Sequence, residues 1–386
     1  MTRSPHKDVE HTGPGTLAGR FMRHFWHPIY RSDDLKPGRP ARVQAFGEFF
    51  TLYRGETGTA HLVDDRCPHR QTSLFLGWVR GDTIQCFYHG WTFDGAGQCV
   101  AQPAEKASFA AKVRIRSYPV REYLGLVFAY LGEGAPPEFP LFPELEDTAG
   151  GGQLVVNRYV VPCNFFQRYE NDLDEVHVHF VHAVSTEKVG LTEIPDVQVE
   201  ETEYGIRREG VRGGGEGNYH LIGHHMMPNI SMVDLVPSPE FPYRTFQVAW
   251  RVPIDDESMT TFSVGLRRLD PELAALGKVR PAMKVDPDPL TLSADILAGK
   301  LRIQDVDPSY PALFIVKDNV VLGGQGRITD RANDRLGQSD KGVILLRRIW
   351  ERELRALDEG RPLKVWRRPA HKLNLTFAGL ESVPGQ

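Results

Sequence analysis

The sequence predicts an α+β protein in which a small all-β domain precedes a larger domain with helices packed on an antiparallel sheet. Two observations support this fold class. From about residue 28, short runs of β-branched and aromatic residues alternate with Gly, Asp and Pro turns, and after about residue 150 longer strands alternate with amphipathic helices. A chain of 386 residues can hold two such domains, at 28–150 and 151–386, after an N-terminal segment at 1–27.

The N-terminal segment is predicted to hold one helix. Leu17, Phe21, Phe25 and Trp26 recur at helical spacing on one side, and we expect the segment to pack on the larger domain. In the all-β domain, Asp94-Gly-Ala-Gly97 predicts a hairpin turn. Its strands are predicted at 49–53, 60–63, 83–86 and 126–130. The Pro-, Glu- and Gly-rich stretch 132–152 reads as the connector to the next domain.

The larger domain is predicted to start with a strand and a mostly helical stretch, at 153–161 and 163–182. Further strands are predicted at 230–236, 245–252 and 260–266. Ser339 to Leu357 predicts a helix, because Ser339 or Asp340 can cap it and four apolar residues form a stripe. Those four are Val343, Leu346, Ile349 and Leu354. The Pro-, Leu- and Asp-rich stretch 270–310 is expected to form a cover over this domain.

Composition excludes several classes of protein. Lys and Arg number 46 and Asp and Glu 50, a net charge of −4, so no basic surface indicates nucleic acid. No apolar run of about 18 residues predicts a membrane span, and the polar start lacks a signal-peptide core. Only four Cys occur, which favours the reducing cytoplasm over a disulfide framework. Two of them, Cys99 and Cys163, are expected to be packed thiols.

The other two Cys belong to the first candidate site. Cys67 and His69 form one short pair, and Cys86 and His89 form another, with 16 residues between the pairs. Thiolate and imidazole donors in this arrangement suit zinc or a [2Fe–2S] cluster. Zinc fingers usually pair Cys with Cys and His with His, whereas each pair here is mixed. Mixed pairs let the two Cys hold one iron and the two His the other, which favours the cluster over zinc or unrelated residues.

A second candidate site lies in the predicted helix at 163–182. Asn171, Asp174 and His177 are spaced to share a face, and His182 follows five residues after His177. That step is about 140° around an ideal helix, so both imidazoles can reach one ion only if the helix ends or distorts there. Two His and one carboxylate form the facial triad of non-haem iron oxygenases. Packed or solvated helix histidines are the plainer alternative, which the upstream cluster motif makes less attractive.

These motifs carry a family resemblance. The chain reads C-P-H-R at 67–70, C-F-Y-H-G-W at 86–91 and E-N-D-L-D-E-V-H-V-H-F-V-H at 170–182. It resembles the terminal oxygenase component of Rieske non-haem iron aromatic-ring-hydroxylating systems over nearly its whole length. It is most similar to the phthalate-dioxygenase-like branch with a single kind of subunit, which G-T-L-A-G-R-F-M-R-H-F-W-H-P-I at 15–29 also resembles.

The resemblance implies ligand sets for two metal centres. Cys67 and Cys86 would ligate one cluster iron, and His69 and His89 the other. His177 and His182 would bind a mononuclear Fe(II), and Asp174 resembles the family's bridging Asp, which orients an iron-ligand His and contacts a cluster-ligand His.

The third ligand of the mononuclear iron is expected far downstream. In this branch an Asp precedes Asp-Arg by twelve residues, followed by Leu-Gly and a further Asp. Asp318, Asp330-Arg331, Leu336-Gly337 and Asp340 fit this pattern, so we choose Asp318. Asp305 is the rival, because it follows Gln304 and Gln-Asp is a frequent context for this ligand, whereas Lys317 precedes Asp318. Asp330 is then expected to be a salt-bridged or capping residue.

The resemblance also implies the function. A reductase or ferredoxin would pass electrons, drawn ultimately from NAD(P)H, to a terminal oxygenase that hydroxylates an aromatic, carboxylated substrate with O2. Oxidative O- or N-demethylation is the alternative, and a Rieske electron carrier without catalysis a remoter one. The expected assembly is a homotrimer with no nucleic-acid or membrane partner. Candidate substrate-binding residues are Asn171, Phe166, Arg168 and Met227, although a core position is favoured for Phe166 and Met227, and a surface position is an equal alternative for Arg168.

Overall fold

The computed structural model describes residues 5–148, 151–182, 193–214, 217–235, 242–276 and 285–373. The chain divides into two compact units. Unit 1 comprises 1–10, 140–251 and 256–386, and unit 2 comprises 11–139 and 252–255. Residues 11–27 therefore lie in unit 2, while residues 5–7 of the predicted N-terminal segment lie against the last long helix of unit 1, where His6 Nε2 is 2.8 Å from Asp358 Oδ2.

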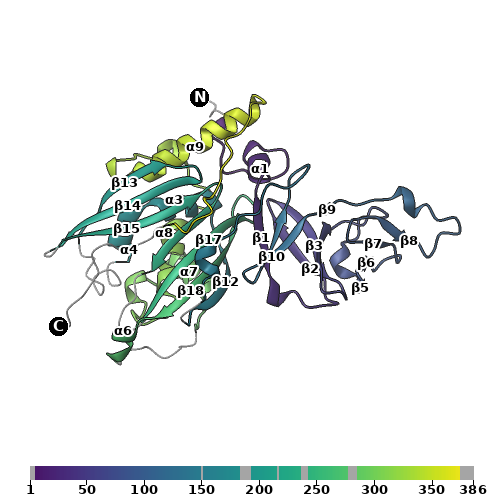
Figure 1. Ribbon diagram of the computed structural model, residues 1–386, viewed down its shortest axis with the longest axis horizontal. Helices are drawn as coiled ribbons and strands as arrows, with labels where there is room; N and C mark the ends of the chain where they lie inside the picture. The colour runs from purple at the N-terminus through teal and green to yellow at the C-terminus, as the bar shows by residue number, and fades with distance from the viewer. Residues whose placement is uncertain are drawn as a thin grey trace. The chain divides into compact units, whose positions relative to one another are not determined.

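Unit 2 is built from three small antiparallel sheets after one short helix, α1 (Leu17–Met22) (Figure 1). In sheet order, the first contains β1 (Trp26–Arg31), β11 (Leu126–Tyr130) and β10 (Val120–Tyr123). The second contains β2 (Ala41–Ala45), β3 (Glu48–Arg54), β4 (Ala60–Asp64) and β9 (Ser117–Tyr118). The third contains β5 (Trp78–Arg80), β6 (Thr83–Gln85), β7 (Thr92–Asp94) and β8 (Cys99–Ala101).

The predicted strands of this unit are confirmed, but the predicted helix is too long. Thr16 caps α1 by accepting a hydrogen bond from the Gly19 N–H at 3.1 Å, and the helix ends at Met22. Trp26 is instead the first residue of β1, opposite Tyr130. Pairing with β11 outweighs the helical spacing of the apolar residues, since a strand partner satisfies the backbone there.

The core of unit 2 surrounds the two cysteines of the first candidate site. Cys67 and Cys86 are 1% and 2% exposed and pack among aromatic and branched side chains. These neighbours are Tyr53, Val63, Leu74, Ile84, Trp91, Phe93 and Ile115. Asp94 and Gly97 form the predicted hairpin turn, with Gly97 at φ +83° and its N–H bonded to the Asp94 carbonyl at 2.9 Å.

Unit 1 is organised on one seven-stranded antiparallel sheet (Figure 1). Its order is β12 (Gln153–Val161), β18 (Met259–Leu269), β17 (Tyr243–Pro253), β16 (Ile230–Leu235), β15 (Gly217–Met226), β14 (Gly205–Gly214) and β13 (Asp196–Glu201). The four predicted strands of this unit are confirmed, although residue 236 lies outside the described residues.

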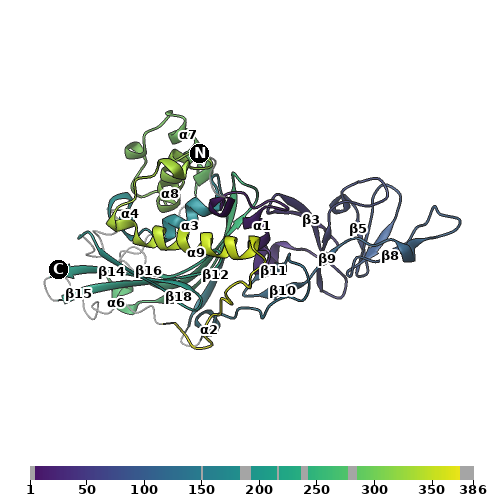
Figure 2. The same ribbon diagram turned by 90° about the horizontal axis from the view of Figure 1, so that it is seen from above.

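Helices of unit 1 cover one side of this sheet, as Figure 2 shows for α3, α8 and α9. The helices are α2 (Pro143–Glu146), α3 (Phe165–Leu173), α4 (Glu175–Val181), α6 (Pro271–Ala275), α7 (Pro289–Leu297), α8 (Leu313–Gly324) and α9 (Lys341–Asp358). The predicted C-terminal helix is confirmed as α9, and its four stripe residues are buried. The α+β class predicted from the sequence is therefore confirmed.

The predicted cover at 270–310 contains α6 and α7, and residues 277–284 of it lie outside the described residues. In α7 and the loop after it, Leu292 and Val306 pack with Val316 of α8. Cys99 and Cys163 are buried thiols, as predicted. Across the described ranges, the structure contains no helix that is both long and apolar enough to span a membrane.

Candidate metal centres

Two loops of unit 2 with the same backbone turn carry the first donor set. Cys67 begins one loop and Cys86 the other, and each carbonyl accepts a hydrogen bond from the N–H four residues later. The donors are Gln71 at 2.8 Å and Gly90 at 3.0 Å, both with positive φ, 62° and 74°. Because a non-glycine residue rarely adopts this conformation, Gln71 shows that the turn is held by its surroundings.

The two thiols lie on the buried side of these loops and interact with each other. A hydrogen bond between them lowers the pKa of Cys86 to about 6 and raises that of Cys67. Backbone N–H groups two and three residues later also donate to each sulfur, which favours the thiolate. The pair is thus prepared to ligate a metal from the core side.

The two imidazoles lie on the outer side and are partly exposed. The ring centroids of His69 and His89 are 4.5 Å apart, and His69 stacks on Trp91 at 4.6 Å with an interplanar angle of 6°. In the part of the chain that the structure describes, the four donors do not supply three atoms within 4.8 Å of one another. A tetrahedral zinc site would bring them to roughly 3.5 Å from one another, so the spread fits a two-iron cluster better.

The second donor set lies in unit 1, where the chain breaks between two helices. The stretch predicted to be mostly helical at 163–182 is helical, but it forms two helices, because Asp174 ends α3 and begins α4. Its Oδ1 accepts hydrogen bonds from the N–H groups of Val176 and His177 at 3.0 and 3.1 Å. The expected end near His182 is present, since α4 stops at Val181 and His182 is its C-cap.

His177, His182 and Asp318 meet in this unit. Their donor atoms all lie within 4.8 Å of one another, with His182 Nε2 at 3.0 Å and His177 Nε2 at 3.8 Å from Asp318 Oδ1. The ring of His182 stacks on Phe314 of α8 at 3.7 Å. Two neutral imidazoles and one carboxylate are the donors that non-haem Fe(II) takes, so this group fits such an ion.

The charges around Asp318 favour its ionised form. Burial alone would raise the pKa of Asp318, but the Arg168 guanidinium and the two imidazoles together lower it well below its ordinary value. Burial lowers the pKa of His182, although Asp318 opposes this. The site therefore holds an anionic carboxylate and a neutral imidazole, the protonation states that a metal requires.

The structure brings some of the other predicted residues to this group and leaves others elsewhere. Asn171 Nδ2 lies 3.4 Å from His177 Nε2. Phe166 is fully buried against Trp350, with ring centroids 5.3 Å apart, and therefore belongs to the core. Met227 is buried next to a cis Pro228 and is not among the donor atoms. Asp305 is exposed in a 3₁₀ turn, which leaves Asp318 as the carboxylate that meets the imidazoles.

Two details differ from the expected roles. Asp174 contacts His177 Nδ1 through its backbone carbonyl, while its carboxylate caps α4. Arg168 is neither a surface residue nor open to a substrate, because it is buried between Asp172 and Asp318. Asp330 caps the turn that follows it, as expected.

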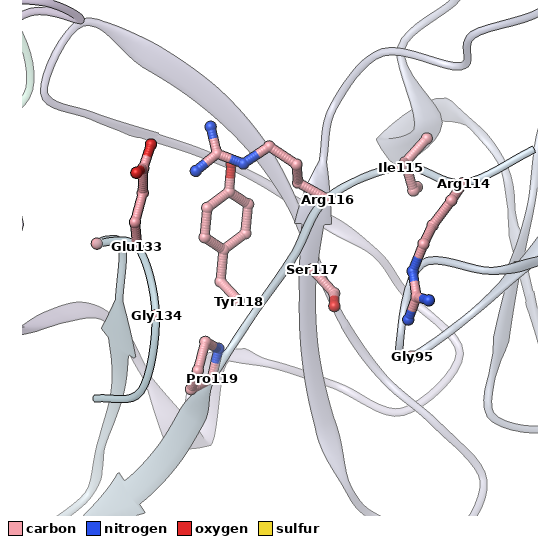
Figure 3. Close-up of a pocket in the computed structure, with 10 residues that line it drawn as sticks. Gly95, Arg114, Ile115, Arg116, Ser117, Tyr118, Pro119, Glu133 and Gly134 are labelled. Atoms are coloured by element: carbon pink, nitrogen blue, oxygen red, sulfur yellow. The ribbon is translucent and has the colours of Figure 1, made fainter.

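Sequence reasoning missed Asp172 and Phe314. The signal for Asp172 was its position four residues after Arg168 on one helix face. Phe314 had no signal, because α8 was not predicted as a helix. A separate hollow of about 850 Å³ in unit 2, drawn in Figure 3, is lined by Arg114, Arg116, Tyr118 and Glu133 among others and contains neither donor set.

Comparison with known proteins places the chain in a family. Residues 25–119 match the model of the Rieske [2Fe-2S] domain. The chain is 31% identical over 383 residues to the 5,5'-dehydrodivanillate O-demethylase oxygenase subunit of a Sphingobium species, covering 96% of this chain and 84% of the relative. It is 30% identical to the phenoxybenzoate dioxygenase subunit alpha of Ectopseudomonas oleovorans, covering 92% and 86%.

Solved structures show the same fold. A Pseudomonas putida CBB5 NdmA mutant with theobromine matches with a TM-score of 0.66 at 21% identity, over 88% of this chain and 92% of that one. The fold, the matched domain and the full-length relatives agree with the resemblance inferred from the sequence. The chain belongs to the Rieske-type oxygenases, as a relative of their terminal oxygenase subunits.

Proposed function

We propose that the chain is a terminal oxygenase that holds two metal centres in its two units. The [2Fe–2S] cluster would be ligated by Cys67, His69, Cys86 and His89, and a mononuclear Fe(II) by His177, His182 and Asp318. The observation that carries this proposal is the convergence of the last three donors from α4, its C-cap and α8, although His182 and Asp318 are 136 residues apart in sequence. A non-catalytic Rieske carrier has no need of such a group.

When bound, the cluster supplies single electrons and the iron supplies O2 activation. The chain's own residues orient the donor side chains and exclude water from them. Contact of the Asp174 carbonyl with Nδ1 of His177 fixes that tautomer and turns Nε2 toward Asp318. Phe314 covers one face of the His182 ring, and Asp318 is only 4% exposed, so the donor group is shielded from bulk water.

Electrons would come from a reductase or ferredoxin, as in terminal subunits of this family, and reach the iron across a subunit boundary. Oδ2 of Asp174 has no partner among the described residues and can accept an N–H from another chain. His89 is flanked by Phe87 and Tyr88, which are 59% and 51% exposed. Large exposed aromatics beside a donor residue favour a contact surface. We therefore propose a head-to-tail homotrimer in which His89 meets Asp174 of a neighbour.

For the substrate we propose an aromatic carboxylate. On the sheet side of α4, the buried guanidiniums of Arg208 and Arg212 share one carboxylate, Glu175. Among the described residues, Nε of Arg208 and Nη1 of Arg212 are buried without a hydrogen-bond partner. Asp172 and Asp174 also favour the charged form of Arg208, so these guanidiniums belong to a buried ion network, and the support for a carboxylate comes from a relative. Phenoxybenzoate, in the name of one relative, is such an acid. We also propose a cytoplasmic location, since all four thiols are free.

Oxidative O-demethylation is the second candidate, because the relative that is 31% identical over 96% of the chain is named an O-demethylase. The same donor groups serve both reactions, so the identity of the product distinguishes them.

We expect purified protein to be red-brown with three irons per chain. Stoichiometric zinc without visible absorbance would contradict the cluster. Aromatic acids and methoxy-aromatic acids should then be screened for NADH-coupled O2 uptake with the reductase. A diol product indicates ring hydroxylation, and formaldehyde indicates demethylation.

A further inference from the structure

The two oxygens of the Asp318 carboxylate have different neighbours. Oδ1 lies toward both imidazoles, 3.0 Å from His182 Nε2 and 3.8 Å from His177 Nε2. Oδ2 lies 3.0 Å from Nη1 of Arg168. The side chains of Asp318 and Arg168 are 6% and 10% exposed, so water does not compete for this ion pair. One oxygen therefore lies toward the two imidazoles, and the other is engaged in the ion pair with Arg168.

Arg168 is itself fixed by a second carboxylate. Its Nη2 lies 3.4 Å from Oδ1 of Asp172, one turn along α3. Arg251 of β17 donates from Nε and Nη2 to both oxygens of Asp172, at 2.7 and 2.8 Å, and from Nη1 to Thr261 of β18 at 3.0 Å. These contacts connect the sheet to α3 and α3 to α8. With both ends of its guanidinium engaged, Arg168 has a fixed position.

We propose that Arg168 pairs with Oδ2 of Asp318 and thereby prevents this oxygen from ligating a metal, so that the carboxylate offers only Oδ1 to an ion held by His177 and His182. Asp172 and Arg251 keep Arg168 in place. This inference rests on the proposed mononuclear site and goes beyond it, because it assigns Arg168 as a positioning residue. Without the guanidinium, Oδ2 is free to ligate as well. The protein would then offer four donor atoms rather than three and leave one position fewer for other ligands.

The test uses cluster-loaded full-length protein and compares Arg168→Met, Arg168→Lys and Arg331→Met. Arg331 is the matched control, because it also joins two buried carboxylates of unit 1, Glu10 at 2.8 Å and Glu170 at 3.0 Å. Two properties are measured: the Fe(II) dissociation constant by competition with a chelator, and the electron paramagnetic resonance of Co(II) placed in the site while the cluster is oxidised. The second reports ligand number and geometry, which a general loss of stability would not change.

We expect Arg168→Met to show an altered Co(II) signal, because Oδ2 becomes free to ligate, and an Fe(II) dissociation constant that differs from wild type by about 10-fold or more, as for other residues that orient metal ligands. Arg168→Lys, which can still pair with Oδ2, should largely restore the wild-type affinity and signal, and Arg331→Met should match wild type. Wild-type affinity and an unchanged signal in Arg168→Met would overturn the inference.

Two further variants separate this inference from the ligand assignment. If Asp318→Ala binds Fe(II) like wild type, the proposed ligand set is wrong, whatever Arg168 does. If Asp318→Ala loses Fe(II) and Arg168→Met matches wild type in both Fe(II) affinity and Co(II) signal, only the role of Arg168 is wrong. Should Arg168→Met fail to fold, Asp172→Asn serves in its place, because it removes the support behind Arg168 while Arg168 and Asp318 remain. An unchanged Co(II) signal and Fe(II) affinity in Asp172→Asn would then count against the proposal.

Discussion

Replacing Glu175 by Gln should destabilise unit 1 strongly. The Glu175 side chain is 1% exposed, and it is the carboxylate that Arg208 and Arg212 share, with Arg212 Nη2 donating to Oε1 at 2.7 Å. Gln keeps the shape of the side chain and removes its charge. Breaking a buried ion pair by removing one partner costs about 3–5 kcal/mol. Because two guanidiniums lose the same counter-charge, we expect the upper half of that range, about 4–5 kcal/mol.

Glu201→Gln is the matched control. Glu201 also joins two cations, Arg352 at 2.9 Å and Lys364 at 2.7 Å, but its side chain is 28% exposed. Water screens such pairs, so this change should cost about 1 kcal/mol or less. Both variants are compared by urea unfolding followed by circular dichroism, with free energies extrapolated to water and m-values checked for equality.

The test is the difference between the two variants in the free energy of unfolding. If Glu175→Gln costs no more than Glu201→Gln, burial does not strengthen the dependence of Arg208 and Arg212 on Glu175. A drop in the m-value instead of the free energy would point to a changed unfolded state.

Three further outcomes are expected. Asp318→Ala should remove one iron per chain and leave the visible spectrum of the cluster unchanged, and if Asp305→Ala does so instead, the ligand assignment is wrong. Asp174→Ala should retain both metals and lose turnover. Cluster-deficient Cys86→Ala chains co-expressed with iron-deficient His177→Ala chains should regain part of the activity in mixed oligomers. Inactive mixed oligomers would show that electrons stay within one chain. Burial raises the pKa of Asp234 to about 6, despite the nearby Arg244. Its folded form therefore holds a proton that the unfolded chain releases between about pH 4 and 6, so stability falls as pH rises through this window. Asp234→Asn should remove that fall and be more stable at pH 8, by at most about 3 kcal/mol in thermal or urea unfolding.

The sequence predicted the features that depend on local spacing. The mixed Cys-His pairs of unit 2, the strands, and the end of the helix at His182 all follow from residue types a few positions apart. The carboxylate was also chosen from a spaced pattern, and the structure brings Asp318 rather than Asp305 to the two imidazoles.

Features that depend on tertiary contacts could not be read in the same way. Arg168 had two plausible sequence interpretations, and burial between carboxylates of α3 and α8 was neither of them. Phe166 lies two residues from Arg168 on the same helix, yet it faces Trp350 of α9 in the core. The direction of a helix face is decided by the elements that pack on it, and those are distant in sequence.

The division of the chain has a consequence for its synthesis on the ribosome. Nearly all of unit 2 is one continuous stretch, 11–139, and both ligand loops of the proposed cluster lie within it. Unit 1 begins with residues 1–10, but it is complete only when Arg331, which pairs with Glu10 at 2.8 Å, and α9 have been made. Since domains generally fold as units while the chain emerges, unit 2 can fold with most of the chain still unmade. Cluster insertion can therefore precede the arrival of Asp318, and His6 and Glu10 must wait for the last third of the chain to meet Asp358 and Arg331.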